Sequence, residues 1–177
     1  LKTTIIEDNY ILSQRTAFDR DLFAQESLRQ YDLIIGNPPY KKIGKDALEA
    51  LAIPEVCYGA PNLYFLFAAM GIKNLKDDAE MVYIIPRSWT SGAYFEKFRK
   101  FLFSHACIEY IHLFESRNKV FDKESVLQET MIVKFKKNTR FPSCITISTS
   151  ATNKDFSDLH KLDVPYQVVV SDNHYYV

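Results

Sequence analysis

Short apolar runs alternate with longer amphipathic stretches along this chain. Residues 31–36 (YDLIIG) form the most compact apolar run, and two prolines follow at positions 38 and 39. A run of this kind predicts a buried parallel strand that ends abruptly in a loop. Similar runs at residues 80–86, 108–114 and 127–135 predict three more strands. The alternation is typical of an α/β sheet.

The stretches between these runs predict helices. Residues 61–75 (PNLYFLFAAMGIKNL) are long and apolar enough for a buried helix with Pro61 in its first turn. Residues 94–104 place aromatic and aliphatic side chains on one side and charges on the other, as an amphipathic helix requires. We further expect a short strand at residues 3–6 and a helix within residues 13–30, where apolar positions 18, 22, 23 and 28 share a face.

The character of the sequence changes after residue 137. Residues 138–161 are rich in Ser, Thr, Asn and Asp, which indicates a boundary toward another module. We therefore divide the chain into a catalytic part, residues 1–137, and an extension or linker, residues 138–177. The chain begins with Leu1, and its last residues (VPYQVVVSDNHYYV) follow a strand pattern. We interpret it as a piece of a longer protein.

Composition limits the function of the chain. Among its 177 residues, 22 Lys and Arg balance 22 Asp and Glu, so there is no general positive field of the kind that marks a self-sufficient nucleic-acid-binding domain. Three widely spaced cysteines and four scattered histidines indicate neither a disulfide framework nor a metal site. No apolar stretch is long enough to span a bilayer, and no export signal opens the chain. We expect a cytoplasmic protein.

The candidate chemistry lies directly after the first predicted strand. Asn37, Pro38, Pro39 and Tyr40 occupy its carboxyl end, where open α/β sheets bind their ligands. Two consecutive prolines bar helix or sheet continuation, so they hold Asn37 and Tyr40 on a stiff turn. By itself such a turn is a modest signal, because Asn-Pro and Pro-Pro pairs occur in many proteins.

This turn suits methyl transfer to an amino nitrogen whose lone pair is delocalised. The Asn37 side-chain carbonyl and the Pro38 main-chain carbonyl can each accept one amino hydrogen, which stabilises the positive charge that grows on the attacking nitrogen. The face of Tyr40 can stack on a planar base removed from a duplex. Covalent catalysis of the cytosine C5 type is not supported, because no cysteine follows a proline.

The run D-L-I-I-G-N-P-P-Y resembles motif IV of amino-group methyltransferases. The residues after it are similar, in order, to further motifs of the gamma-class N6-adenine DNA methyltransferases of restriction-modification systems. N-L-Y with F and F at 62–67 resembles motif V, M-V-Y-I-I-P-R-S-W at 81–89 motif VI, and V-F at 120–121 motif VIII. I-I-E-D-N at 5–9 is similar to motif III. The resemblance covers roughly residues 1–137, from motif III to motif VIII.

The resemblance implies the second half of a Rossmann-like fold dependent on S-adenosyl-L-methionine, with a doubly wound, mostly parallel sheet and a terminal antiparallel strand. It assigns Asn37 and Pro38 to the target amino group, and Tyr40 and Phe121 to the two faces of a flipped adenine. Phe67 and Asp8 would contact the cofactor adenine. Asn9 is an alternative to Asp8, Phe67 could instead serve the core, and Phe121 could be a local plug of its loop.

The chain departs from this family in one respect, because no Gly-rich stretch of the D-P-A-C-G-S-G kind precedes Asp8. The cofactor's methionine and ribose sites are therefore absent, and we expect the chain alone to be inactive. An uncovered sheet edge would favour self-association. The expected partner of the complete protein is double-stranded DNA, together with an endonuclease or specificity domain or subunit. Lys41, Lys42 and Lys45 could contact DNA phosphates or form a solvated loop.

Two other functions remain open at this level. Protein-glutamine and RNA-base methyltransferases share the N-P-P-Y turn and the same amino-group chemistry. The aromatic Phe121 loop argues against them. The chain could also be a non-catalytic scaffold of this fold, although a scaffold has no need to keep Asn37 and both aromatic partners.

Overall fold

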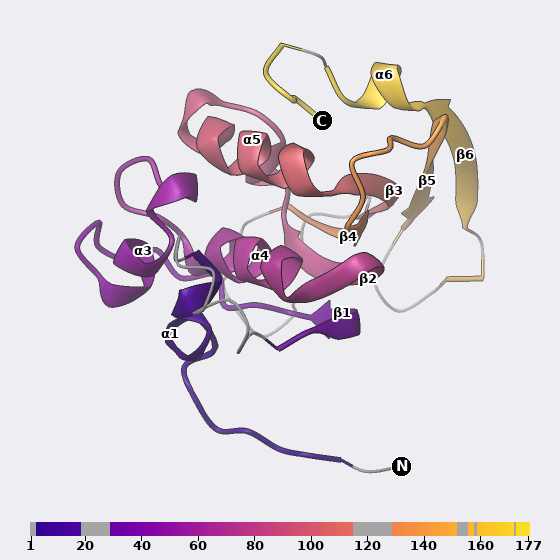
Figure 1. Cartoon of the computed structure of the whole chain (residues 1–177). Coiled ribbons are helices and arrows are strands. Elements are labelled where there is room, and N and C mark those ends of the chain that lie inside the picture. The colour runs from indigo at the N-terminus through magenta and orange to yellow at the C-terminus, as the bar shows by residue number, and fades with distance from the viewer. Residues whose placement is uncertain (1–2, 19–28, 115–128, 152–155, 158, 172) are drawn as a thin grey trace.

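The computed structural model describes residues 3–18, 29–114, 129–151, 156–157, 159–171 and 173–177. Its centre is a six-stranded sheet in the order β1-β2-β4-β3-β5-β6 (Figure 1). The strands are β1 (Tyr31–Gly36), β2 (Leu75–Pro86), β3 (Cys107–Phe114), β4 (Thr130–Lys136), β5 (Cys144–Ser150) and β6 (His160–Pro165).

Most of the strands run in one direction. β1 is parallel to β2 and β3 is parallel to β5, whereas β4 is antiparallel to both β2 and β3. β6 is antiparallel to β5 at the edge. The expected α/β architecture with a mostly parallel sheet is therefore confirmed. The antiparallel strand expected last in the catalytic part is β4, and it inserts between β2 and β3.

Strand boundaries follow the apolar runs, with two differences. β2 begins at Leu75, earlier than expected, because buried Leu75 already pairs with Tyr31 of β1. A salt bridge of 2.8 Å between Lys76 and Asp32 also joins the two strands there. The strand expected at residues 3–6 is wrong. These residues carry no strand pairing, and the side chain of Ile5 is 92% exposed. An isolated extended segment without a neighbouring ladder leaves its main-chain groups to water.

Helices cover one face of the sheet. α4 (Leu63–Asn74) and α5 (Glu96–His105) pack there, and the 3-10 turn Ala93–Phe95 precedes α5. Pro61 is not in the first turn of α4, because Asn62 is the N-cap and its side chain accepts from the amide of Tyr64. Met81, Tyr83 and Ile85 of β2 are buried beneath these helices. The remaining described α-helices are short: α1 (Tyr10–Ser13), α3 (Leu48–Ala52) and α6 (Tyr166–Val169).

Two further expectations concern the ends of the chain. Within residues 13–30, α1 ends at Ser13 and a 3-10 helix follows at Arg15–Phe18, while residues 19–28 lie outside the described part. The strand pattern expected over the last residues is wrong beyond Pro165. The chain there forms α6, whose Tyr166 is buried. Burial of this aromatic side chain outweighs the local pattern.

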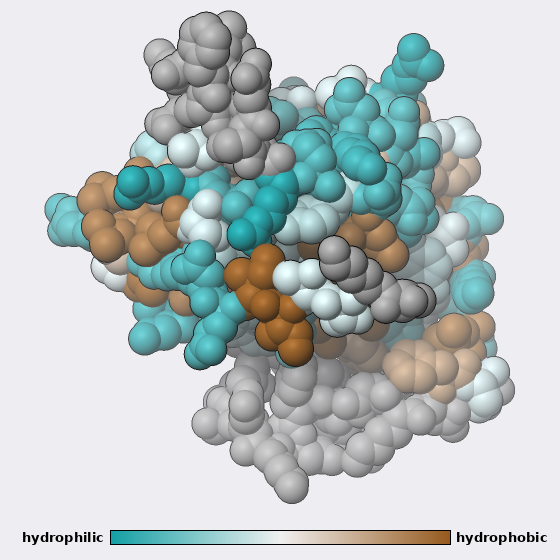
Figure 2. All heavy atoms as spheres, turned by 60° about the horizontal axis from the view of Figure 1, so that its bottom comes forward, coloured by the Kyte–Doolittle hydropathy of each residue, from teal (hydrophilic) through white to brown (hydrophobic). Residues whose placement is uncertain are grey.

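The edge strand β1 leaves apolar side chains in solvent. Ile34 points toward α4, so the alternation along a strand turns Leu33 and Ile35 to the opposite face, where they are 51% and 74% exposed. Figure 2 looks onto the side that is at the bottom of Figure 1 and shows separate hydrophobic areas among hydrophilic ones. Within the residues described, no helix combines the length and apolarity that crossing a membrane requires.

Candidate functional site

The Asn37 to Tyr40 turn leaves the sheet at the carboxyl end of β1. Gly36 is the last residue of β1 and faces Tyr83 of β2, and a Cβ at position 36 would lie 2.8 Å from the Tyr83 ring. Only glycine lets the two strands keep this spacing. Beyond it, Pro38 is buried while Asn37 is exposed and makes no hydrogen bond with a described residue. The Asn37 side-chain amide is thus accessible to solvent, while the next residue, Pro38, is buried and anchors the turn.

Main-chain hydrogen bonds join this turn to the start of α4. The amide of Leu63 donates to the carbonyl of Lys41 at 2.8 Å, and the amide of Ile43 donates to the carbonyl of Pro61 at 2.8 Å. The N-cap Asn62 lies between these two bonds. These hydrogen bonds therefore fix the position of the turn relative to the N-terminus of α4.

Tyr40 is fixed at both ends of its side chain. Its hydroxyl donates to the main-chain carbonyl of Ile84 in β2 at 2.8 Å, and its half-buried ring meets the edge of Tyr64 at a centroid distance of 6.3 Å. Burial raises the pKa of Tyr40 to about 12, so its hydroxyl remains a neutral donor at neutral pH. Tyr64 is itself held by Ser88, 3.1 Å from its hydroxyl.

A cavity of about 260 Å³ lies beside the turn. It brings together Pro39, Asp8 and Phe67, which are far apart in the sequence. Its other lining residues are Asn9, Tyr10, Ile11, Glu49 and Leu63. Pockets for drug-sized ligands are usually about 300–1,000 Å³, so this one has the size for part of a nucleoside. A carboxylate beside an aromatic ring suits a planar base that carries an amino group.

Phe67 serves both the cavity and the core. Its ring packs against Tyr10 at a centroid distance of 5.4 Å and also lines the cavity. Tyr64 and Phe65, on the same helix, are only 1% exposed and belong to the core. Phe67 therefore packs in the core and also borders the cavity, while its contact with the cofactor stays a prediction.

A second hollow, of about 400 Å³, opens at the carboxyl end of β2. Arg87 lies there, 3.1 Å from the carboxylate of Glu129, and its amide donates to the carbonyl of Glu129 at 2.8 Å. Ser88 also lines this hollow. The P-R-S-W run by itself does not indicate a role for Arg87. Its partner Glu129 is 42 residues away in the sequence and comes close to it where β2 and β4 pair.

A buried arginine forms a hydrogen bond with the main chain of the turn after β2. Arg99 is fully buried, and its guanidinium donates to the carbonyl of Trp89 at 3.1 Å and to that of His174 at 3.0 Å. It also lies over the ring of Tyr176, 4.7 Å from its centroid. The amide of Val177 donates to the carbonyl of Thr90 at 3.0 Å. The described end of the chain therefore lies beside the turn that lines the second hollow.

The remaining candidates are not assigned to these cavities. Phe121 lies outside the described residues. Lys41, Lys42 and Lys45 are exposed, which fits either of their two interpretations. Among the described residues, no three His, Cys, Asp or Glu side chains gather as a metal site would require.

A mixed sheet with its turn and hollows at the carboxyl ends of parallel strands defines part of a Rossmann-like methyltransferase, and solved structures share this fold. The type IIG restriction endonuclease BpuSI matches with a TM-score of 0.62 at 16% identity, over 82% of this chain and 20% of that chain. A class I S-adenosylmethionine-dependent methyltransferase from Listeria monocytogenes matches with a TM-score of 0.57 at 19% identity, over 73% and 39%. The chain belongs to the family of Eco57I restriction-modification methylases, which it matches over residues 2–121.

A curated relative supports the same family. Type II methyltransferase M.BsuBI from Bacillus subtilis is 33% identical over 174 residues, covering 98% of this chain and 34% of the relative. The chain spans about a third of the length of the curated relatives that it matches.

Proposed function

We propose that this chain is the catalytic part of a DNA adenine-N6 methyltransferase that uses S-adenosyl-L-methionine within a restriction-modification system. One observation carries the proposal: the Asn37 to Tyr40 turn lies at the carboxyl end of β1, and Pro39 in it lines a cavity, with Asp8 and Phe67, that has the size for part of a nucleoside. An amino-group acceptor and a base-sized site are thus adjacent, as transfer from a bound donor to an amino nitrogen requires. Membership of the methylase family supports this function.

The residues of the turn would act on the target amino group. The Asn37 side-chain carbonyl and the Pro38 main-chain carbonyl would each accept one hydrogen of the adenine N6 group and so stabilise the charge that develops on nitrogen. The donor, when bound, supplies an activated methyl group on a sulfonium. The amino nitrogen would take this methyl group from the sulfur and would then release one proton to solvent.

Two aromatic residues would hold the base outside the duplex. The fixed ring of Tyr40 offers one stacking face, because its hydroxyl is held by Ile84. Phe121 would supply the other. Base flipping leaves the target unpaired, and stacking on an aromatic side chain compensates by about 1–3 kcal/mol per base.

The cavity would receive the adenine end of the cofactor. Asp8 offers a carboxylate acceptor for the adenine amino group and Phe67 an aromatic contact. The chain contains no Gly-rich stretch before Asp8 for the rest of the cofactor. We assign that function to other residues of the whole enzyme, which would also supply DNA recognition and an endonuclease or specificity unit, in the cytoplasm.

The decisive variant is Asn37→Ala in the whole enzyme. We expect single-turnover methylation of a duplex carrying the recognition site to fall by roughly 100- to 1,000-fold, the usual cost of removing one group that stabilises transition-state charge. DNA affinity should stay within about threefold, because Asn37 acts mainly in the transition state. Asn138→Ala, a half-buried asparagine just after the end of β4, serves as a control.

The methylated product identifies the substrate. Digestion of labelled DNA to nucleosides should yield N6-methyl-2′-deoxyadenosine. Turnover by Asn37→Ala close to that of the wild type would remove this residue from the mechanism, and label found in protein or RNA instead of DNA would favour the other amino-group methyltransferases.

A further inference from the structure

Asn9 occupies an unusual position at the cavity, because both ends of its side-chain amide are engaged. Its Oδ1 accepts from the main-chain amide of Leu12 at 3.1 Å, which caps α1. Its Nδ2 donates to Oε1 of Glu49 at 2.9 Å. A main-chain N–H can only donate and a carboxylate can only accept, so these two partners fix the orientation of the amide.

The same residue also holds Asp8. The main-chain amide of Asn9 donates to Oδ1 of Asp8 at 2.7 Å. The other oxygen of Asp8 makes no hydrogen bond with a described residue, and Asp8 lines the cavity. The protein therefore already engages both ends of the Asn9 amide, whereas Asp8 has a carboxylate oxygen that no described residue engages.

The Asn9 to Glu49 bond joins two walls of the cavity. α1 precedes the Asn37 to Tyr40 turn in the chain and α3 follows it, and the two short helices lie side by side (Figure 1). Glu49 is in the first turn of α3 and lies 40 residues from Asn9 in the sequence. Helices of this length gain little stability alone, so a specific bond between them decides how the cavity is shaped.

We propose that Asn9 and Glu49 form a positioning pair that holds the Asp8 carboxylate against the cofactor adenine. The pair acts through Asp8 and does not bind the ligand itself. This inference rests on the proposed function of the cavity. It also decides between Asp8 and Asn9 as the acceptor for the adenine amino group, in favour of Asp8.

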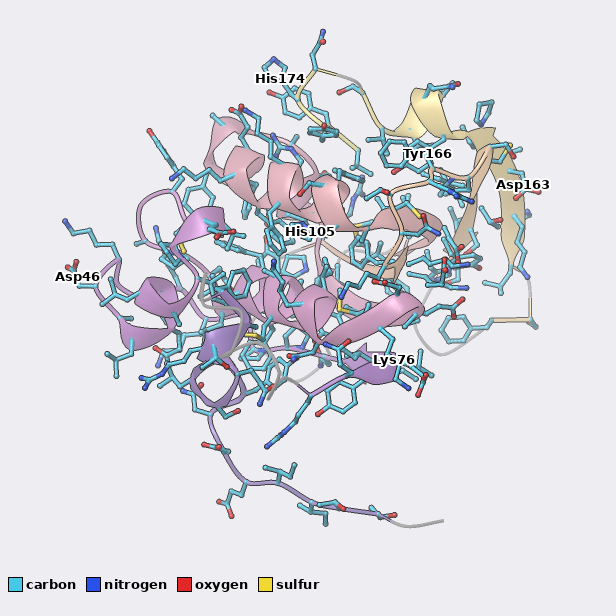
Figure 3. All side chains as sticks on the ribbon, viewed as in Figure 1. Asp46, Lys76, His105, Asp163, Tyr166 and His174 are labelled. Carbon is cyan, nitrogen blue, oxygen red and sulfur yellow. The ribbon has the colours of Figure 1, made fainter. Side chains whose placement is uncertain are left out.

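A reciprocal exchange of the two side chains tests the pair in the whole enzyme. Asn9→Asp keeps a good helix cap but replaces the donor to Glu49 by a second carboxylate. Combining it with Glu49→Gln restores one donor and one acceptor in the reverse order and returns the net charge to that of the wild type. Asp46→Asn, on the exposed loop before α3 (Figure 3), removes one negative charge away from the cavity and is the control.

Binding is measured by calorimetric titration with S-adenosyl-L-methionine and with S-adenosylhomocysteine, which lacks the sulfonium charge. We expect Asn9→Asp to weaken both ligands by about tenfold, the lower end of the effect of a charge-assisted hydrogen bond. Glu49→Gln should weaken them less, and the double variant should return to within about threefold of the wild type. In steady-state assays the single variants should raise KM for the cofactor more than they lower kcat.

Several outcomes would overturn the positioning role. These are wild-type affinity in Asn9→Asp, a double variant as weak as Asn9→Asp, or a change confined to the charged ligand. Asp8→Ala separates this failure from that of the proposed function. If Asp8→Ala binds the cofactor like the wild type, the cavity is not the adenine site. If it weakens binding while Asn9→Asp does not, only the positioning pair is wrong.

Discussion

At the scale of single residues, the ring and the hydroxyl of Tyr40 have different expected roles. The ring would stack on the target base, while the hydroxyl sets the ring's direction through Ile84. Tyr40→Ala removes both and should destabilise the extrahelical base by about 1–3 kcal/mol, the contribution of one stacked base. Tyr40→Phe keeps the ring and should lose less. A fluorescent adenine analogue at the target position of the DNA reports the difference.

Tyr58→Ala is a suitable control for this measurement. Tyr58 is 61% exposed and lines neither hollow, so the fluorescence of its complex should match that of the wild type. Unchanged fluorescence in Tyr40→Ala would show that the ring does not stack on the base.

The sequence predicted the contiguous part of the candidate site and missed the part that depends on packing. Asn37 to Tyr40 could be recognised because four neighbouring residues carry the chemistry and a strong apolar run places them at a strand end. Glu49 could not, because folding brings it to the cavity and to Asn9, which lies 40 residues away in the sequence. The choice between Asp8 and Asn9 likewise depends on which side chain is already engaged.

At the scale of elements, Gly71 sets how closely α4 approaches β2. A Cβ at this position would lie 2.7 Å from the sulfur of Met81 and 3.3 Å from the hydroxyl of Tyr83. We expect Gly71→Ala to lower the free energy of unfolding by about 1–3 kcal/mol, because overpacking outweighs the higher helix propensity of alanine. Urea unfolding monitored by circular dichroism measures it.

Gly44 offers a matched control for this substitution. No atom lies within 4 Å of a Cβ at that position, so Gly44→Ala should change the free energy of unfolding by less than about 0.5 kcal/mol. Equal stability of the two variants would mean that α4 tolerates a larger spacing from the sheet.

Strands that coincide with apolar runs were predictable, and the two strands of the polar extension were not. β1, β2, β3 and β4 follow the apolar runs expected for them. β5 and β6 lie in the Ser- and Thr-rich extension, and most residues of β6 are exposed. Their order comes from pairing with β3 and with each other, which the local pattern does not encode.

At the scale of the whole molecule, we expect the chain to contact only the adenine end of the cofactor. We expect the isolated 177-residue chain to show no calorimetric binding of S-adenosyl-L-methionine at micromolar concentrations. Asp8 and Phe67 would contact only the adenine end, and a few such contacts hardly offset the entropy lost on immobilising the ligand. Tight binding by a monomer would mean that residues 1–30 hold a cofactor site of another kind.

The same sample addresses the state of association. Leu33 and Ile35 on the edge strand β1 are exposed, and open apolar edges favour pairing with a second copy. We propose that the isolated chain self-associates through this edge, which the concentration dependence of its sedimentation would show.

The buried guanidinium of Arg99 makes two distant segments thermodynamically dependent on each other. Both of its hydrogen bonds end on main-chain carbonyls, one at Trp89 and one 75 residues away at His174. Linkage is reciprocal, so a ligand that shifted the turn after β2 through this contact would also affect residues 173–177, and a partner of those residues would affect the turn. Displacement of that terminal segment would therefore be expected to change the shape of the hollow beside Arg87.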